Sequence, residues 1–365
     1  MLTCHLLPAF PGLTAEPFAS YRYFVSVAEE MAIPKAGRNL SAILRYVAGL
    51  AVGIVVLLLL FGKRAEFAAA WRQLGGVDGG WLAVAVAAET ASLWLYARLQ
   101  HRVLRLTGTV LAMPALFVLT LANDAIASTV PGEPAVSSAY RYRYYRRHGA
   151  SSAGAGWTIF TVLIAQAIGM SLVLLLGVLV ALAGRAGGPN TRTAVAGLVI
   201  IVGAIAVLVR RDLVLRLTAG LVRAARRAAG QRADSIGSRI ETTLERMRQI
   251  PFGTLKAAWV VTLAAGVWLA DFGCLLCAFR AVHAAIPWSG VLLAYCVAQI
   301  AGMLPIVPGG IGIVEGSLAA ILAAYGTDRA SALAAALGFR LVSFWLAVAV
   351  GWISVAAIAR RARRP

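Results

Sequence analysis

Long apolar runs dominate the chain, and short polar stretches rich in arginine separate them. A helix needs about 20 apolar residues to cross the hydrocarbon core of a bilayer. Several of the runs approach or exceed that length, so the pattern predicts an all-α polytopic membrane protein. The apolar segments lie at residues 43–62, 79–97, 109–130, 157–183, 193–209, 257–281, 288–307, 311–326 and 333–359.

Composition supports this interpretation. The 365 residues are 60% hydrophobic and only 13% charged, whereas soluble domains carry about 25% charged residues. The net charge of +19 comes from Lys and Arg clusters that lie beside the apolar segments. Such clusters are typical of cytoplasmic loops and of contact with anionic headgroups, so we expect no nucleic-acid partner.

The distribution of Lys and Arg assigns the two sides of the membrane. The basic loop 210–256 and the basic tail 360–365 should be cytoplasmic. Counting crossings from these two anchors, and from Lys35, Arg38 and Arg45 as a third cytoplasmic anchor, places both ends of 109–150 inside and both ends of 284–332 outside. Each of these regions must therefore enter and leave by one face. The prediction is about six full transmembrane helices plus two re-entrant hairpins with Pro-Gly tips.

The two hairpin regions also look related. Each contains Val-Pro-Gly, and the order span, span, hairpin, span occurs twice along the chain. Opposite entry faces would make this an inverted-topology repeat, a design found in transporters. The expected units are a disordered N-terminal tail at 1–40, a transmembrane domain at 41–359 with halves 41–192 and 193–359, and the tail 360–365.

Glycine, proline and a glutamate interrupt the apolar sequence between Pro308 and Glu315. Irregular backbone at membrane depth is tolerated where it is buried in protein or lines a cavity. The N–H groups that begin the following helix would attract an anion such as phosphate. The alternative is a surface loop in which Glu315 caps its helix. The candidate residues at the two tips are Pro131, Gly132, Glu133, Pro308, Gly309, Gly310 and Gly312.

Charged side chains within apolar segments form a second group of candidates, because an intramembrane charge usually marks a functional site with a partner. We pair Glu315 with Arg340, either as part of a transport site or as a structural ion pair. Asn123 and Asp124 face the same cavity or pair with Arg141. The remaining candidates are Glu89 and Asp271, which serve as proton-linked sites, as counter-charges or as satisfied structural groups.

Several motifs resemble a known family. The C-terminal motifs are Pro308-Gly-Gly-Ile-Gly-Ile-Val-Glu315, Tyr325-Gly326 and Phe339-Arg340-Leu-Val-Ser-Phe-Trp345. They resemble the signature of the lysylphosphatidylglycerol synthase transmembrane-region family, also called flippase-like membrane proteins. Val130-Pro-Gly, with Tyr140-Arg-Tyr-Arg and Arg146-Arg-His-Gly149, resembles the first block of that family. Family members often carry a charged pair in the next span, where this chain has Gln166.

The resemblance covers about residues 40–359 and implies a flippase for aminoacyl-phospholipids or lipid-linked glycans in a bacterial plasma membrane. No catalytic motif is seen, and the chain ends at Pro365 without space for the aminoacyltransferase domain of bifunctional relatives. We therefore expect no enzymatic activity, no cofactor and no metal. Expected partners are a membrane phospholipid or another polar lipid, and a second copy or an envelope enzyme. The alternatives are a non-catalytic scaffold or regulatory subunit for cell-envelope lipid enzymes, and a membrane-embedded lipid transferase.

Overall fold

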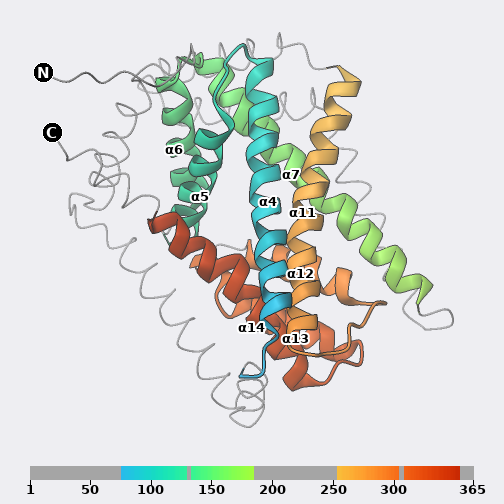
Figure 1. The fold of residues 1–365 in the computed structure, drawn as a ribbon. Coiled ribbons are helices and arrows are strands. Elements are labelled where there is room, and N and C mark those ends of the chain that lie inside the picture. The colour runs from blue at the N-terminus through green and yellow to red at the C-terminus, as the bar shows by residue number, and fades with distance from the viewer. Residues whose placement is uncertain (1–74, 130–132, 185–252, 304–307, 354–365) are drawn as a thin grey trace, which may run out of the picture.

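Helices make up all the regular structure that the computed structural model describes, which covers residues 75–129, 133–184, 253–303 and 308–353 (Figure 1). Four of these helices are long and apolar enough to cross a membrane. They are α4 (Gly79–Leu106), α7 (Ser152–Ala183), α11 (Thr254–Ala281) and the helix Arg329–Ile353, which begins as α14 (Arg329–Arg340). The prediction of an all-α membrane protein is confirmed.

Some sequence predictions fall outside the described residues. The segments at 43–62 and 193–209, nearly all of the basic loop 210–256, and both termini lie there. The number of crossings and the division into two halves therefore remain predictions.

The shorter helices form two sequential pairs. The first pair is α5 (Met113–Thr129) with α6 (Glu133–Arg147), and the second is α12 (Val291–Gly302) with α13 (Ile313–Ala324). At about 1.5 Å per residue, each is shorter than the roughly 30 Å hydrocarbon core. Their membrane depth, and thus the re-entrant character predicted for them, remains a prediction.

Each pair returns to the end of the molecule from which it started. A Cβ built on Gly154, at the start of α7, would lie 3.0 Å from the Thr107 side chain at the end of α4. A Cβ built on Gly290, just before α12, would overlap the ring of Tyr325, just after α13. In Figure 1 the α5–α6 pair accordingly lies near the upper end of α4, and the α12–α13 pair near the lower end of α11.

The antiparallel helices α4 and α11 form the centre of the bundle (Figure 1). The Asp78 amide donates to the Ala281 carbonyl over 2.9 Å, and Ser92 Oγ donates to the Val267 carbonyl over 3.1 Å. Helix α7 crosses α11 so closely that a Cβ on Gly169 would lie 2.7 Å from the Ala264 carbonyl carbon. Small residues allow such backbone approach, which drives helix association in membranes.

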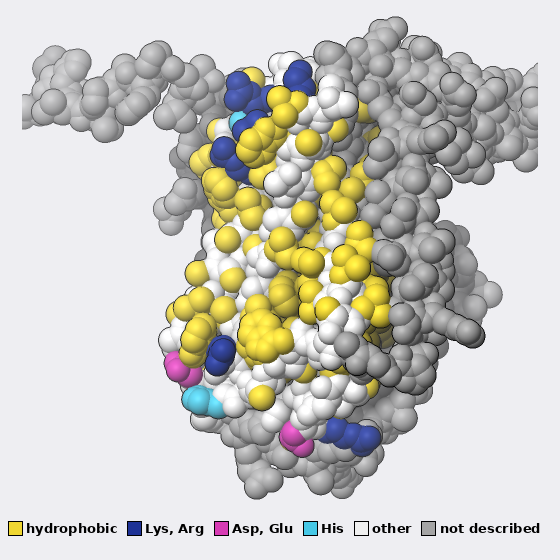
Figure 2. Space-filling model, turned by 90° about the vertical axis from the view of Figure 1, so that its right-hand side faces the viewer, with side chains coloured by type: hydrophobic (Ala, Val, Ile, Leu, Met, Phe, Trp, Pro, Cys, Tyr) yellow, Lys and Arg dark blue, Asp and Glu magenta, His cyan; other side chains and the backbone are white. Residues whose placement is uncertain are grey.

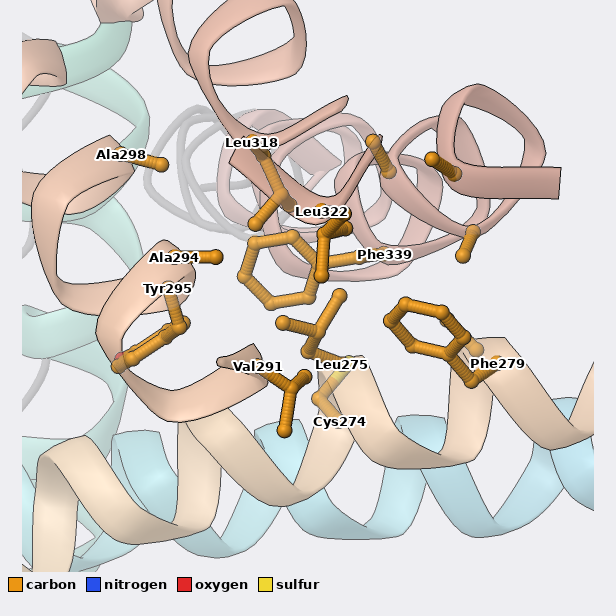
Figure 3. Close-up of a cluster of buried hydrophobic side chains, with 14 of the residues drawn as sticks. Cys274, Leu275, Phe279, Val291, Ala294, Tyr295, Ala298, Leu318, Leu322 and Phe339 are labelled. Atoms are coloured by element: carbon orange, nitrogen blue, oxygen red, sulfur yellow. The ribbon is translucent and has the colours of Figure 1, made fainter. Parts of the chain in front are cut away.

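Buried apolar side chains join α11, α12, α13 and α14 on one side of this centre (Figure 3). Tyr295 and Phe339 stack edge to face with ring centroids 6.2 Å apart, and both are almost completely buried. Between helices in a membrane, dispersion and packing supply the attraction. This cluster fixes α12 against α11 and thereby positions the polar end of Tyr295.

Hydrophobic side chains cover the middle of the described part of the face shown in Figure 2, and most of the Lys and Arg on that face lie at its upper end. Helix α4 continues to Leu106, beyond the predicted end at residue 97. Arginine is a good helix former, and Arg98 and Arg102 stack over Trp94 and Trp259 at 5.2 and 5.6 Å. These contacts explain why the helix extends through its basic segment.

Gly169→Ala should weaken the bundle, although alanine favours a helix by about 1 kcal/mol over glycine. The added methyl would overlap the α11 backbone, and overpacking typically costs about 1–3 kcal/mol. The melting temperature of the detergent-solubilised protein should fall. Gly273→Ala is the matched control, since its Cβ would meet only the Ala88 Cβ at 3.9 Å. Equal melting temperatures for the two variants would contradict the close crossing.

Candidate functional site

A cavity of about 450 Å³, lined by both polar and apolar side chains, lies between the two helix pairs and the central helices. Residues from α4, α5, α6, α7, α11, α12, α13 and the last helix line it. The lining combines both signs of charge with hydroxyl and amide groups. The charged lining residues are Glu89, Asp124, Arg141, Asp271 and Arg340.

The second helix pair meets the first at the cavity. Pro308 begins the short 3₁₀ turn Pro308–Gly310, and Gly309 has a positive φ of 64°. A Cβ on Gly309 would lie 2.4 Å from the Phe344 ring and 3.1 Å from the Ser128 carbonyl oxygen near the end of α5. Both the backbone conformation and the close contacts therefore require glycine here.

An ion pair connects this turn to the last helix. Arg340 Nε donates to Glu315 Oε1 over 2.8 Å, and Arg340 Nη2 donates to the Gly309 carbonyl over 2.7 Å. Glu315 Oε2 accepts the Gly312 amide at 2.6 Å, and Arg340 also lies 4.1 Å above the Phe344 ring. Each charge is buried but paired, as low-dielectric surroundings require. The predicted pairing of Glu315 with Arg340 is confirmed.

A π-helical turn, Leu341–Leu346, directly follows Arg340. The turn places Ser343 and Phe344 in the cavity wall beside Arg340. π turns within α-helices often occur at functional sites because they redirect side chains. One local distortion of the last helix thus determines where the Ser343 and Phe344 side chains lie relative to the Arg340 guanidinium.

Two carboxyl groups meet across the α4–α11 contact. Glu89 and Asp271 are 8% and 7% exposed, and their side chains lie within hydrogen-bonding reach of one another. Asp271 Oδ2 accepts the Tyr295 hydroxyl at 2.5 Å and Gln299 Nε2 at 2.8 Å. In contrast, Glu89 Oε2 is buried without a hydrogen-bond partner among the described residues.

Polar groups of α5, α6 and α7 line another part of the wall. Arg141 Nη1 donates to the Tyr96 hydroxyl over 2.5 Å, whereas Arg141 Nε is buried without a partner in the described structure. Asn123 Oδ1 and Gln166 Oε1 are likewise buried and unpartnered there. Buried polar atoms normally have partners, so this part of the wall is the least completely hydrogen-bonded of the three polar groups at the cavity.

The cavity gathers most of the side chains that the sequence had singled out. Gly309, Arg340, Asn123, Asp124, Gln166, Glu89, Asp271 and Arg141 line it, and Glu315 lies behind Arg340. Gly310 and Gly312 contribute to the turn and do not belong to the lining. Glu133 begins α6, but its side chain is not among those described, and Pro131 and Gly132 lie outside the described residues.

Sequence reasoning missed Tyr295 and Gln299, which hold Asp271, and Ser343 in the π turn. Tyr295 and Gln299 are four residues apart and so share a face of α12. The polar Tyr295 and Gln299, four residues apart in an otherwise apolar segment, could have indicated a polar face on this helix. No pattern in the sequence indicated the π turn.

No group of three or more His, Cys, Asp or Glu suited to holding a metal ion occurs in the part of the chain that the structure describes. The described polar residues at the cavity instead suit hydrogen bonding and charge recognition. Hydroxyl, amide, carboxyl and guanidinium groups converge there from helices far apart in sequence.

Removing either charge of the Glu315–Arg340 ion pair should lower the free energy of unfolding strongly. Glu315→Gln or Arg340→Gln leaves one buried charge unpaired, which typically costs about 3–5 kcal/mol. The double variant should lose less than the sum, because it leaves neither charge behind. Unfolding free energies of the four proteins give this coupling. As a control, Asp328→Ala removes an exposed helix cap and should cost only about 1 kcal/mol. If the double variant lost the sum of the two single losses, the pairing would be contradicted.

Comparison with known proteins agrees with the helical architecture and the motifs. A membrane protein of the UPF0104 group from Methanothermobacter thermautotrophicus is 30% identical to this chain over 102 residues. The match covers 28% of this chain and 30% of the relative, so it spans less than a third of that protein's length. The family model described as "Lysylphosphatidylglycerol synthase TM region" matches residues 46–351, and the chain therefore belongs to this family of multi-pass integral membrane proteins.

Proposed function

We propose that the protein is a lipid flippase. The polar headgroup of a membrane lipid would pass through the cavity while its acyl or prenyl tails remain in the bilayer. The observation that carries this proposal is a cavity with five charged lining residues, within a helical body whose described face in Figure 2 is hydrophobic over its middle. Polar space at membrane depth is costly unless it serves a polar solute.

The size and chemistry of the cavity support a headgroup as the solute. Ligand pockets usually measure about 300–1,000 Å³, and this cavity of about 450 Å³ falls within that range. It offers a guanidinium for phosphate and carboxylates for an amine. An aminoacyl-phospholipid carries both a phosphate and an amine, and a lipid-linked glycan carries phosphate and hydroxyl groups.

Arg141 is the cation that we assign to the lipid phosphate. Arg340 is already occupied by Glu315 and the Gly309 carbonyl, so its charge is compensated within the protein. Arg141 makes a bond to a neutral tyrosine, and its Nε has no partner among the described residues. Arginine binds phosphate oxygens through paired N–H donors. Asn123 and Gln166 line the same cavity and would offer amide groups to the rest of the headgroup.

We propose further that the protein resides in a bacterial plasma membrane with its C-terminus in the cytoplasm. The Lys and Arg bias that assigned the loops supports this orientation. We also propose that the protein moves lipid rather than modifying it. It would act alone, with a second copy of itself, or in a complex with a cell-envelope enzyme.

Arg141→Gln should slow lipid movement without unfolding the protein. A hydrogen bond to a charged group contributes about 1.5–3 kcal/mol, so the rate at limiting lipid should fall at least about tenfold. Purified protein would be reconstituted into liposomes containing fluorescent phospholipids, and dithionite quenching would report lipid that reaches the outer leaflet. Arg280→Gln removes an exposed arginine at the end of α11 and should leave the rate unchanged.

If lipid movement is absent with every headgroup tested, including aminoacylated phospholipids and polyprenyl phosphates, the flippase proposal is wrong. The scaffold alternative would then account for the protein better. Equal slowing by Arg280→Gln would show that surface charge, and not the cavity, controls the rate.

Filling the cavity should also block movement. Ser343→Trp places a large ring in the wall, whereas Ser171→Trp adds the same ring to α7 at a position that does not line the cavity. The first variant should lose lipid movement in the dithionite assay, and the second should retain it. Retained movement in a folded Ser343→Trp protein would exclude a path through the cavity.

A further inference from the structure

The pair of carboxyl groups at the α4–α11 contact has no counter-cation bonded to it among the described residues. Glu89 and Asp271 lie within hydrogen-bonding reach of one another, and each is more than nine-tenths buried. Two carboxylates at such a distance repel strongly, and burial removes the water that would screen them. One proton shared between the two groups removes this repulsion and forms the hydrogen bond between them.

The partners of the two groups indicate where that proton resides. Asp271 accepts hydrogen bonds from the Tyr295 hydroxyl and the Gln299 amide, and it also experiences the positive charge of Arg340. These interactions stabilise a carboxylate. Glu89 has no comparable donors, and its Oε2 is unpartnered in the described structure. Asp271 is therefore the anion, and Glu89 is the acid that donates to it.

The neighbouring charges reinforce this assignment. Asp124 on α5 lines the same cavity and places a further carboxyl group near Glu89. Arg340 on the last helix is compensated by Glu315, and Arg141 on α6 is bonded to Tyr96. The other titratable groups beside the pair are Cys274 on α11 and Tyr295 on α12.

The pair is also open to the cavity, which distinguishes it from a sealed structural bond. Both carboxyl residues belong to the cavity lining. Asn123, which is 8% exposed, lines the same cavity, and its Oδ1 is buried without a partner among the described residues. Glu89 and Asn123 thus both line the cavity, and Glu89 Oε2 and Asn123 Oδ1 are both buried without a partner in the described structure. The cavity beside the pair has room for the water or the lipid amine that exchanges a proton with it.

We propose that the Glu89–Asp271 pair is a proton-binding site of the cavity, with one proton on Glu89 shared toward Asp271. On release, the Glu89 O–H bond breaks, the proton passes to a base in the cavity, and the charge of the pair changes from −1 to −2. On uptake, the same bond forms again. The doubly charged pair attracts a cationic group, so the proton and an amine compete for it. Whether the pair holds a proton does not depend on the proposed function. Coupling of that proton to lipid movement does rest on the proposed flippase function.

Infrared spectroscopy of the full-length protein in lipid nanodiscs tests the site directly. A protonated carboxyl group has a carbonyl stretching band that a carboxylate lacks. The wild-type spectrum at neutral pH should contain this band, and the difference spectrum against Glu89→Gln should show its loss. Asp78→Asn is the control, because Asp78 caps α4 as an exposed side chain and asparagine caps helices equally well. That variant should retain the band in full.

Asp271→Asn gives a second, independent readout. Replacing a carboxylate acceptor with an amide weakens the hydrogen bond from Glu89, so the band should move to higher frequency. The shift of the band in Asp271→Asn tests the shared proton even if Glu89→Gln does not fold. A wild-type protein without the band, a band that persists in Glu89→Gln, or a band that stays unmoved in Asp271→Asn would overturn the proposal.

The liposome assay then tests the link to transport. An imposed pH gradient should change the rate of lipid movement by the wild type and should have no effect on Glu89→Gln. If both proteins respond equally to the gradient, the coupling proposal is wrong. The infrared band without any lipid movement would refute only the flippase proposal, and lipid movement without the band would refute only the proton site.

Discussion

Arg340 is the residue on which the candidate site depends. A guanidinium buried among apolar helices is tolerated only when acceptors within the protein surround it. Here the acceptors are a carboxylate on α13 and a backbone carbonyl in the glycine turn before it. This arrangement ties the turn, α13 and the last helix into one unit. Phe344 and Ser343, which follow Arg340 in the same helix, belong to the cavity wall. The paired guanidinium therefore fixes this part of the wall.

The three groups of polar side chains at the cavity differ in how completely they are satisfied. The Arg340–Glu315 group has its charges paired and its turn amide capped. The Asp271 group has two donors on one carboxylate. The group around Arg141, Asn123 and Gln166 retains unpartnered atoms in the described structure. The three groups thus differ in how many of their polar atoms are hydrogen-bonded, and the most completely bonded group, Arg340–Glu315, is the one that holds the turn and the last helix together.

Much of this could be predicted because the sequence signals were local. Charges in apolar helices are rare enough to identify Glu315, Arg340, Glu89 and Asp271 as candidates. The contact between Glu89 and Asp271 was not predictable, since it depends on the register of α4 against α11. Similarly, the N–H groups before this helix were expected to attract an anion, with capping by Glu315 as the alternative, and the Gly312 amide does donate to Glu315 of the same helix. That outcome requires a side-chain rotamer, which spacing alone does not determine.

The glycine crossing at Gly169 constrains how the molecule can move. Side chains of Ala165 and Val173 occupy the equivalent positions one turn away on α7. Sliding α7 along α11 by one turn would bring one of these larger side chains against the Ala264 backbone, where only glycine fits. Shear between packed helices requires an interface that tolerates such displacement. The close crossing therefore opposes sliding of α7 along α11 and fixes the register of these two helices.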